Sequence, residues 1–322
     1  MGRDVTVVLI AWNSAEWLAR CLESLRAQSV AGGTVRLVAI DNASSDASAS
    51  MIAAAEPAEL IRNPVNRGFA AAANQGIAAA RGDWVLFLNP DVRMERGYLE
   101  QCIQALEGAG ERFGSATGTL YRAEGSEMRP LPELDSCGIR MTRSGRHLDI
   151  DDPLPPRASG AREVFGVSGA AALYRLACLR DLEIDGSIFD EDFFAYREDA
   201  DLAWRARLFG WRSLHVPEAI AYHVRRVTPQ VRRSLPPEIN MHSVKNRFLL
   251  RMKNEGAALA LRNAPWEIPR DLAVLGATLT TERSSLPAWR WLWQHRGRIA
   301  RKREAVQRRR VVSDHDIAVW FR

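Results

Sequence analysis

The chain has 322 residues, of which 47% are apolar and 26% charged, and its formal net charge is +5 at pH 7. This length and apolar content allow a large buried core and exclude an intrinsically disordered chain. The apolar stretch 5–11 is too short for a secretory leader, and no apolar run is long enough to cross a membrane. We therefore expect one large α/β domain, alone or with appendages.

Cysteines and charges are unevenly distributed along the chain. The four cysteines, at positions 21, 102, 137 and 178, are too far apart for a CxxC pair or a zinc-binding pattern. Such cysteines indicate a reducing compartment, so we expect a cytoplasmic protein. Nine lysines or arginines and one acid occupy 289–310, whereas six carboxylates occupy 190–201. These two segments are expected to have separate functions.

The chain begins with two strand-and-helix units. The β-branched run Val5–Ile10 predicts a strand, and Asn13 with Glu16 three residues later resembles a capping box that starts a helix. A second strand is predicted over 35–40, ending at Asp41 before a run of cap-forming residues. A carboxylate is thus predicted at the carboxyl end of a strand.

A turn, a small-residue helix and another strand follow. The sequence NPVNRG at 63–68 predicts a turn in which Gly68 supplies a positive φ angle. Close packing explains the alanines of the next helix, but Asn74 inside it is mildly unfavourable, which favours a functional role for this residue. The apolar run 84–88 predicts a strand covered on both faces, as in a parallel sheet.

That strand ends at Asn89-Pro90-Asp91, which has two interpretations. All three are ordinary turn residues. However, α/β sheets bind ligands beyond the carboxyl ends of their parallel strands, and Asp91 is predicted to stand at such an end. The chain contains neither GxGxxG nor GxxxxGK[ST], so a bound nucleotide would be held without these phosphate-binding loops.

The second half contains an insertion and another buried strand. A helix is predicted over 94–106 and a strand over 116–121. The segment 122–162 is rich in Pro, Gly and charge, and it predicts a loop and hairpin insertion. The run 164–174 predicts a buried strand whose two glycines allow close approach of another group.

The six carboxylates of 190–201 surround the start of a predicted helix, 198–210. Acids stabilise the first turn of a helix, which explains one or two of them but not six. A strand over 211–216 and His223 come next, and a lone histidine is more often structural than a ligand. Val244 and the residues beyond it predict basic helices.

Taken together, these segments resemble the inverting family 2 glycosyltransferases, from Val5 to about Lys253. The resemblance implies the GT-A nucleotide-sugar-binding fold, an α/β fold whose Rossmann-like sheet is mixed and mostly parallel with flanking helices. It implies a catalytic domain over 1–235, with a nucleotide-sugar-binding half (1–120) and an acceptor and catalytic half (121–235), and a basic helical C-terminal extension over 236–322. Five blocks carry the resemblance: VVLIAWNSAEWLARCLESLRAQ, VAIDNASSD, NPVNRGFAAAANQGIAAARGDWVLFLNPDV, FDEDFFAYREDADLAWRARLFGW and His223.

The resemblance assigns the nucleotide-sugar donor to residues of the first half. Asp41 matches the acid that accepts a hydrogen bond from N3–H of uracil or thymine. Trp12 matches the position where an aromatic ring stacks on the base. The other matching positions, beside the base or lining the nucleotide and sugar, are Ala11, Asn66, Gly68 and Asn74.

The resemblance assigns the metal and the chemistry to four further residues. Asn89 and Asp91 hold the outer places of the DxD motif, which binds Mg²⁺ or Mn²⁺. Asn89 lacks a charge, so it contacts either the metal or the ribose or sugar. Asp199 matches the catalytic base, and His223 matches a position that reaches the metal or diphosphate. The residues after His223, Val-Arg-Arg-Val-Thr, lack the glycine that often follows in relatives.

These roles fit the chemistry of sugar transfer. A carboxylate must remove the proton of the acceptor hydroxyl as it attacks the anomeric carbon. A divalent metal offsets the charge of the leaving diphosphate. One displacement inverts the anomeric centre without a covalent enzyme intermediate.

Three features look most like the rhamnosyltransferase-like branch: NPD, EDxDLxxR and KNRFLLRMKN. They imply transfer of L-rhamnose from dTDP-L-rhamnose to a glycan or lipid-linked glycan, as in bacterial polysaccharide and cell-wall biosynthesis. Asp41 does not distinguish thymine from uracil, so a UDP-sugar is the alternative donor. The alternative is a non-catalytic nucleotide-sugar- or glycan-binding module with a degenerate DxD motif.

The basic, tryptophan-rich segment 289–310 has three interpretations. It could lie on an anionic membrane, as in a peripheral enzyme on the inner face of the cell membrane. It could be a solvated helix with a tryptophan-packed face. Nucleic-acid binding is the least favoured. Trp289, Trp291 and Trp293 alternate and so do not share one helical face, which counts against an amphipathic helix.

Overall fold

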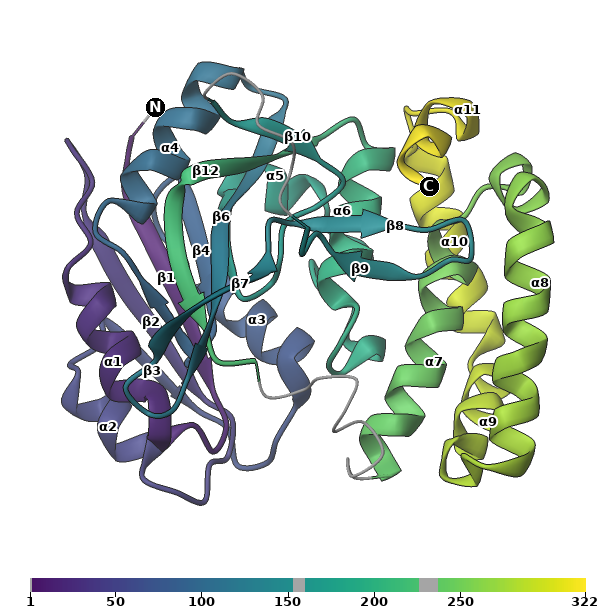
Figure 1. The fold of residues 1–322 in the computed structure, drawn as a ribbon, viewed down its shortest axis with the longest axis horizontal. Helices are drawn as coiled ribbons and strands as arrows, with labels where there is room; N and C mark the ends of the chain where they lie inside the picture. The colour runs from purple at the N-terminus through teal and green to yellow at the C-terminus, as the bar shows by residue number, and fades with distance from the viewer. Residues whose placement is uncertain (1, 153–159, 226–236) are drawn as a thin grey trace.

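The computed structural model describes residues 2–152, 160–225 and 237–322. Its strands are β1 Val5–Ala11, β2 Val35–Asp41, β3 Glu59–Arg62, β4 Trp84–Leu88, β5 Val92–Met94, β6 Phe113–Glu124, β7 Arg129–Ser136, β8 Ile139–Met141, β9 His147–Asp149, β10 Arg162–Val164, β11 Ala171–Arg175 and β12 Arg212–His223. Ten of them form a mixed sheet with the order β10-β12-β6-β11-β4-β1-β2-β3, to which β5 adds on β12 and β7 on β6 (Figure 1). The strands β8 and β9 form a separate hairpin.

The half of the sheet built from β3, β2, β1 and β4 is entirely parallel. Their carboxyl ends therefore meet at one edge, where Ala11 lies opposite Asp41. Beyond β4 the sheet changes direction: β11 is antiparallel to both β4 and β6, and β6 is parallel to β12. The α/β class with a mixed sheet is confirmed.

Helices cover both faces of this sheet. They are α1 Ala15–Arg26, α2 Ser48–Ala54, α3 Gly68–Ala79, α4 Tyr98–Ala109, α5 Leu176–Asp181 and α6 Glu198–Leu208. In β1, Val7 and Leu9 belong to one buried cluster with residues of α1 and α4. Val8 and Ile10 belong to another with residues of α3 and α6. Because alternate side chains of a strand point to opposite faces, burial of both faces explains the unbroken apolar runs.

Three predictions were wrong, and pairing explains each of them. The run 164–174, predicted as one strand, is divided: β10 ends at Val164 and pairs with β12, whereas β11 begins at Ala171 and pairs with β4 and β6. The helix predicted from Met94 begins at Tyr98, because Met94 ends the short strand β5, which pairs with β12. The strand predicted over 211–216 continues to His223 through an irregular register between Val216 and Ile220. The predicted insertion 122–162 contains the end of β6 with β7 and the β8–β9 hairpin, and its residues 153–159 lie outside the described residues.

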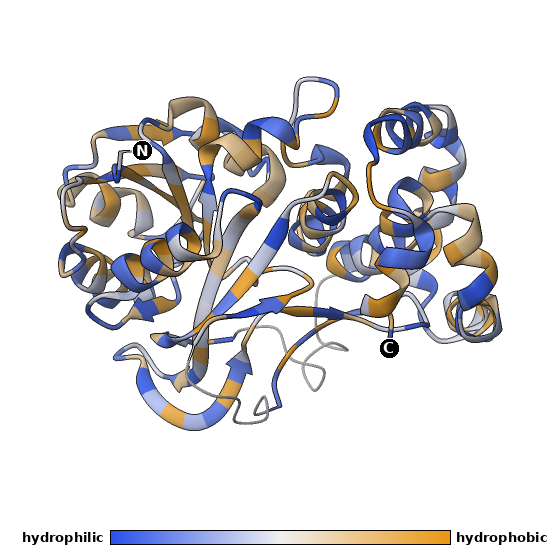
Figure 2. Ribbon diagram, turned by 90° about the horizontal axis from the view of Figure 1, so that it is seen from above, coloured by the Kyte–Doolittle hydropathy of each residue, from blue (hydrophilic) through white to orange (hydrophobic). Residues whose placement is uncertain are grey.

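The C-terminal helices form a group at one side of the molecule, beside α6 (Figure 1). They are α7 Pro237–Asn254, α8 Ala257–Thr280, α9 Leu286–Gln294, α10 Arg296–Arg309 and α11 Asp314–Ile317. Figure 2 shows orange, apolar bands on these helices as well as on the sheet. Leu249, Ile299 and Phe321 are buried in the same cluster as Phe165 and Trp204. The helices therefore share a core with the sheet-bearing part.

The predicted domain boundary between 235 and 236 lies outside the described residues. Within the described residues, no helix is long and apolar enough to cross a membrane.

Candidate active site

The predicted base-binding residues lie together at the carboxyl ends of β1 and β2. Ala11 is the register partner of Asp41, and its carbonyl accepts a hydrogen bond from Asn42 N–H at 2.8 Å. Asp41 is only 6% exposed, and its Oδ1 accepts a hydrogen bond from Ser44 N–H at 3.2 Å. Trp12, the next residue after Ala11, is 48% exposed and so presents a broad aromatic surface.

The turn before α3 is fastened beside Asp41. Asn66 Oδ1 accepts hydrogen bonds from Gly68 N–H at 2.8 Å and from Asn42 Nδ2 at 2.9 Å. Gly68 has a φ of +78°, and a Cβ there would lie 2.5 Å from the carbonyl oxygen of Phe194. Glycine is thus required at this turn by both conformation and space.

Asn74 has a structural partner. Its side chain donates to the carbonyl of Phe189 at 2.9 Å and accepts from the N–H of Phe189 at 2.8 Å. These two bonds fasten α3 to the segment that leads into the carboxylates of 190–201. They account for an asparagine inside the helix, and its contact with the donor stays a prediction.

Asp91 and His223 are brought together by strand pairing. Val92 in β5 is the register partner of His223 in β12. His223 Nε2 lies 3.5 Å from Asp91 Oδ1, and His223 Nδ1 lies 2.7 Å from Asp135 Oδ2. Apart from this ion pair at 3.5 Å, the Oδ1 atom of Asp91 is buried without a hydrogen-bond partner within the part of the chain that the structure describes. A buried carboxylate oxygen of this kind is suited to a ligand that the protein itself does not supply.

The charges around His223 change its proton affinity. Burial alone would lower its pKa, but the carboxylates of Asp91 and Asp135 raise the pKa of His223 to about 10. At neutral pH His223 is therefore a cation, and it could ligate a metal through Nε2 only after losing that proton. Asp135, behind His223, fixes the orientation of the ring.

These residues fit a divalent metal whose coordination the substrate completes. Mg²⁺ is usually bound by one or two carboxylates together with substrate phosphates. Asp91 offers its buried oxygen, His223 lies beside it, and Asn89 precedes Asp91 by two positions. Among the described residues, no group of three or more His, Cys, Asp or Glu side chains could hold a metal alone. A diphosphate would therefore have to supply further ligands.

Asp199 lies in the first turn of α6, against the backbone of Gly169. The N–H of Gly169 donates to Asp199 Oδ2 at 3.3 Å, and a Cβ at position 169 would lie 3.3 Å from the same oxygen. The predicted close approach at a glycine is thus confirmed. Burial, and next the charge of Asp149, raise the pKa of Asp199 to about 6. A carboxylate with this pKa is suited to accept a proton near neutral pH.

A series of ion pairs connects the two predicted centres. Arg225 Nε lies 2.8 Å from Asp135 Oδ1, and Arg225 Nη2 lies 2.5 Å from Asp149 Oδ2. Asp135 also contacts His223, and Asp149 is the charge that raises the pKa of Asp199. No sequence motif marks Asp135, Asp149 or Arg225, so none of them was predicted. Asp135 and Asp149 lie in the insertion, and Arg225 follows β12.

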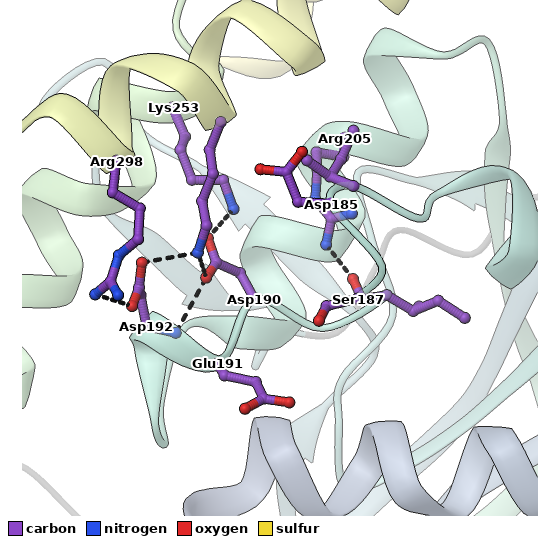
Figure 3. A pocket seen from close by; sticks show the side chains of 11 residues that line it. Asp185, Ser187, Asp190, Glu191, Asp192, Arg205, Lys253 and Arg298 are labelled. Carbon is purple, nitrogen blue, oxygen red and sulfur yellow. Dashed lines mark hydrogen bonds and ion pairs between the residues drawn. The ribbon is translucent and has the colours of Figure 1, made fainter.

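Three of the six carboxylates in 190–201 bind the C-terminal helices instead of a ligand. Lys302 donates to Asp190 at 2.5 Å and to Asp192 at 2.7 Å. Lys253 donates to Asp190 at 2.6 Å (Figure 3) and to Asp201 at 3.0 Å. A cavity of about 180 Å³ is lined by members of this cluster and by none of the predicted site residues. Helix capping did not explain all six acids. Three of them are now explained by ion pairs that hold the C-terminal helices against this segment.

The fold is that of the GT-A glycosyltransferases. The mannosyltransferase PcManGT from Pyrobaculum calidifontis, solved in complex with GDP-Man and Mn²⁺, superimposes with a TM-score of 0.54 at 18% identity. The match covers 98% of this chain and 87% of that one. Residues 6–181 match the family Glycosyl transferase family 2, and the chain belongs to that family. The resemblance noted in the sequence is therefore confirmed at the level of family and fold.

Two relatives show how far the similarity extends. The chain is 35% identical over 134 residues to the succinoglycan biosynthesis protein ExoO of Rhizobium meliloti. That match covers 41% of this chain and 38% of ExoO, so the chain spans about two fifths of that relative's length. It is 29% identical over 244 residues to the N-acetylglucosaminyl-diphospho-decaprenol L-rhamnosyltransferase of Mycobacterium tuberculosis, covering 67% of this chain and 75% of that protein.

Proposed function

We propose that this family 2 glycosyltransferase transfers L-rhamnose from dTDP-L-rhamnose to a glycan or lipid-linked glycan, with inversion at the anomeric carbon. The observation that carries the proposal is the arrangement of Asp91, His223 and Asp199. The first two meet at 3.5 Å beyond the sheet edge, and ion pairs lead from them towards a half-buried carboxylate with a raised pKa.

Asp199 is the proposed base. It accepts the proton of the acceptor hydroxyl while that oxygen bonds to the anomeric carbon and the bond to the diphosphate breaks on the opposite face. The N–H of Gly169 orients the carboxylate. Mg²⁺ or Mn²⁺ bound at Asp91, with His223 and Asn89 beside it, would supply positive charge that offsets the leaving diphosphate.

The donor is proposed to lie along the carboxyl ends of β1 and β2. Asp41 accepts the hydrogen bond of the base N3–H, Trp12 stacks on the base, and Ala11 lines the base. The turn that holds Asn66 and Gly68 is fastened beside them through Asn42. Because thymine and uracil present the same N3–H, the base contact does not choose between dTDP- and UDP-sugars.

Two similarities support rhamnose as the sugar: the similarity to the mycobacterial L-rhamnosyltransferase, and the resemblance of the stretch KNRFLLRMKN to the rhamnosyltransferase-like branch. In the structure this stretch lies in α7 and holds the segment before the proposed base. Asn246 Nδ2 donates to the carbonyls of Phe193, Ala195 and Tyr196 at 2.8 to 2.9 Å. We also propose a cytoplasmic location, since all four cysteines are unpaired and buried.

The test is release of nucleoside diphosphate from dTDP-L-rhamnose, dTDP-glucose, UDP-glucose and GDP-mannose in the presence of lipid-linked glycan acceptors. We expect turnover with dTDP-L-rhamnose, and a loss of roughly 10²- to 10⁴-fold in Asp199→Asn because the base is removed. The exposed Asp151→Asn is the matched control and should be as active as the wild type. Full turnover by Asp199→Asn would refute the base, and preference for another donor would refute rhamnose.

The same assay tests whether turnover requires a divalent metal. EDTA is expected to abolish turnover and Mn²⁺ to restore it, while dTDP with Mn²⁺ should raise the melting temperature of the wild type more than that of Asp91→Asn. An unchanged rate in EDTA would remove the metal from the reaction. Donor binding without turnover across the acceptors would favour the alternative of a non-catalytic binding module.

A further inference from the structure

The helix α8 has its polar and apolar sides reversed relative to a helix that covers a core. Three of its four buried side chains are polar: Asn263, Glu267 and Thr278. Five of its six exposed large apolar side chains, all except Trp266, recur at intervals of three, four or seven residues, which places these five on one face of the helix. This set, the α8 stripe, consists of Leu261, Ile268, Leu272, Leu275 and Leu279.

Polar contacts fix the orientation of α8, so the stripe cannot turn inward. Arg251 of α7 bonds to Asp271 and pairs with Glu267 at 3.4 Å. Trp289 Nε1 donates to Thr278 Oγ1 at 3.0 Å. These bonds would be lost if the helix rotated to bury its leucines. The stripe is strongly exposed, at 79% for Leu261 and 62% for Leu272.

The charges around the stripe have one sign. From Ala257 to Gln294, a segment that the structure describes in full, the exposed charged side chains are Arg262, Arg270, Arg283 and Arg290. The acids of that segment, Glu267, Asp271 and Glu282, are buried or half-buried. Trp266 and Trp293, also exposed, add amphipathic rings. Arg262 follows Leu261, and Arg283 Nε donates to the carbonyl of Leu279 at 3.3 Å. Arg270 is two residues from both Ile268 and Leu272 and so lies on the other side of the helix. The surface is therefore apolar along α8 and cationic at the two ends of the stripe.

We propose that the α8 stripe lies in the interface of an anionic lipid bilayer, with Arg262 and Arg283 among the headgroups. A helix with leucines on one side and arginines beside them binds in this way, parallel to the membrane. From Leu261 to Leu279 the stripe extends about 27 Å at 1.5 Å per residue. Anionic lipids complement its arginines, whereas a second copy would bring arginines of the same sign against them.

This surface differs from the segment 289–310 expected from the sequence. Trp289 packs on Phe248 with ring centroids 4.6 Å apart, and Trp291 stacks on His295 at 4.2 Å. Contact through α8 extends the proposed function, because it would hold the enzyme where a lipid-linked acceptor lies. Vesicle binding itself does not depend on the donor or on catalysis.

The test is flotation of the full chain with phosphatidylcholine vesicles that contain or lack phosphatidylglycerol, at low and high salt. The wild type should float with the anionic vesicles and be partly released by salt. The triple variant Ile268→Ser, Leu272→Ser, Leu279→Ser should bind at least about tenfold more weakly, since three apolar side chains lose their burial. Arg262→Gln with Arg283→Gln should lose the preference for anionic vesicles.

Control variants separate this proposal from folding and from activity. Val311→Ser with Val319→Ser alters exposed aliphatic residues outside α8 and should bind as the wild type does. Asp199→Asn should also float normally, and the triple variant should keep its melting temperature and its turnover with a water-soluble acceptor. Equal binding of the triple variant and the wild type would overturn the proposal. So would a wild-type dimer that the triple variant converts to a monomer, because a second copy would then cover the stripe.

Discussion

Asp199 is held so that its carboxylate takes up a proton within reach of physiological pH. Burial and the charge of Asp149 both favour the neutral acid, which is why the pKa of Asp199 lies near 6 instead of its ordinary value of 3.8. Glu198, the preceding residue, has a raised pKa for similar reasons, namely burial and the charge of Asp199. At the start of α6, burial and neighbouring carboxylates therefore favour the protonated forms of Glu198 and Asp199.

This environment predicts the pH dependence of turnover. A general base must be deprotonated, so kcat/KM should rise about tenfold per pH unit below pH 6 and level off above it. Asp149→Asn removes a negative charge that raises this pKa, and it should move the rising limb to lower pH. A pH profile of donor turnover for both proteins is the measurement. If the rising limb of the pH profile lies at the same pH in Asp149→Asn as in the wild type, Asp149 does not raise the pKa of Asp199.

At this scale, the sequence identified the residues at strand and helix ends but not their partners. Asp41 and Asp91 stand where a strand stops, and Asp199 stands where a helix starts, so local patterns mark them. Asp135 reaches His223 only because β7 pairs with β6 and β12 lies on the other side of β6. Such contacts depend on the strand order of the whole sheet, which no short segment encodes.

The elements α7 and α10 hold the acidic segment from one side. Lys253 lies among Asp190 and Asp201 with its side chain only 2% exposed, and Lys302 of α10 reaches Asp190 as well. Although burial opposes it, the charges of Lys253 and Lys302 lower the pKa of Asp190. A lowered pKa means that this stabilisation is present above the ordinary pKa of aspartate and is lost as the pH falls below it.

We predict that Lys253→Met lowers the free energy of unfolding by about 1.5–3 kcal/mol, because two buried carboxylates lose a charged hydrogen-bond donor while Asp190 keeps Lys302 and Asp201 keeps Arg205. Arg308→Ala is the matched control. It breaks the exposed pair Arg308–Glu304, which lies four residues apart on α10, and should change the free energy by only about 0.3–0.5 kcal/mol. Urea denaturation at neutral pH measures both. Similar small effects from the two variants would show that the buried cluster is not what fastens α7 to the acidic segment.

Elements with strong local patterns were predicted well, and those defined by pairing were not. The start of α6 at Glu198 follows from the acids of its first turn, and α3 follows from its alanine run after Gly68. By contrast, β5 has three residues, and its pairing with β12 decides where α4 can begin. The reversed polarity of α8 was also missed, because a helix pattern does not say which face meets the core.

The molecule as a whole has one apolar core that extends from the sheet into the last helices. Phe321 lies 5.0 Å from Trp204 of α6 and 6.1 Å from Phe165, as ring centroids. Backbone hydrogen bonds join the same parts: Val311 N–H donates to Leu208 at 2.8 Å, and Arg322 N–H donates to Met141 at 3.2 Å. The segments predicted as catalytic domain and extension therefore contribute to a common interior.

We accordingly predict that the full chain unfolds in one transition and that a chain ending at residue 235 does not reach the native state. Truncation would expose Trp204 and leave the carboxylates of 190–201 without their lysines. Circular dichroism and tryptophan fluorescence of the full chain should give coincident melting curves. Phe321→Ala should lower the free energy of unfolding by about 3–5 kcal/mol, whereas Val319→Ala, at a side chain 57% exposed, should change it by no more than about 0.5 kcal/mol. Two separate transitions, or a truncated chain that melts like the full one, would show that the C-terminal helices are an independent appendage.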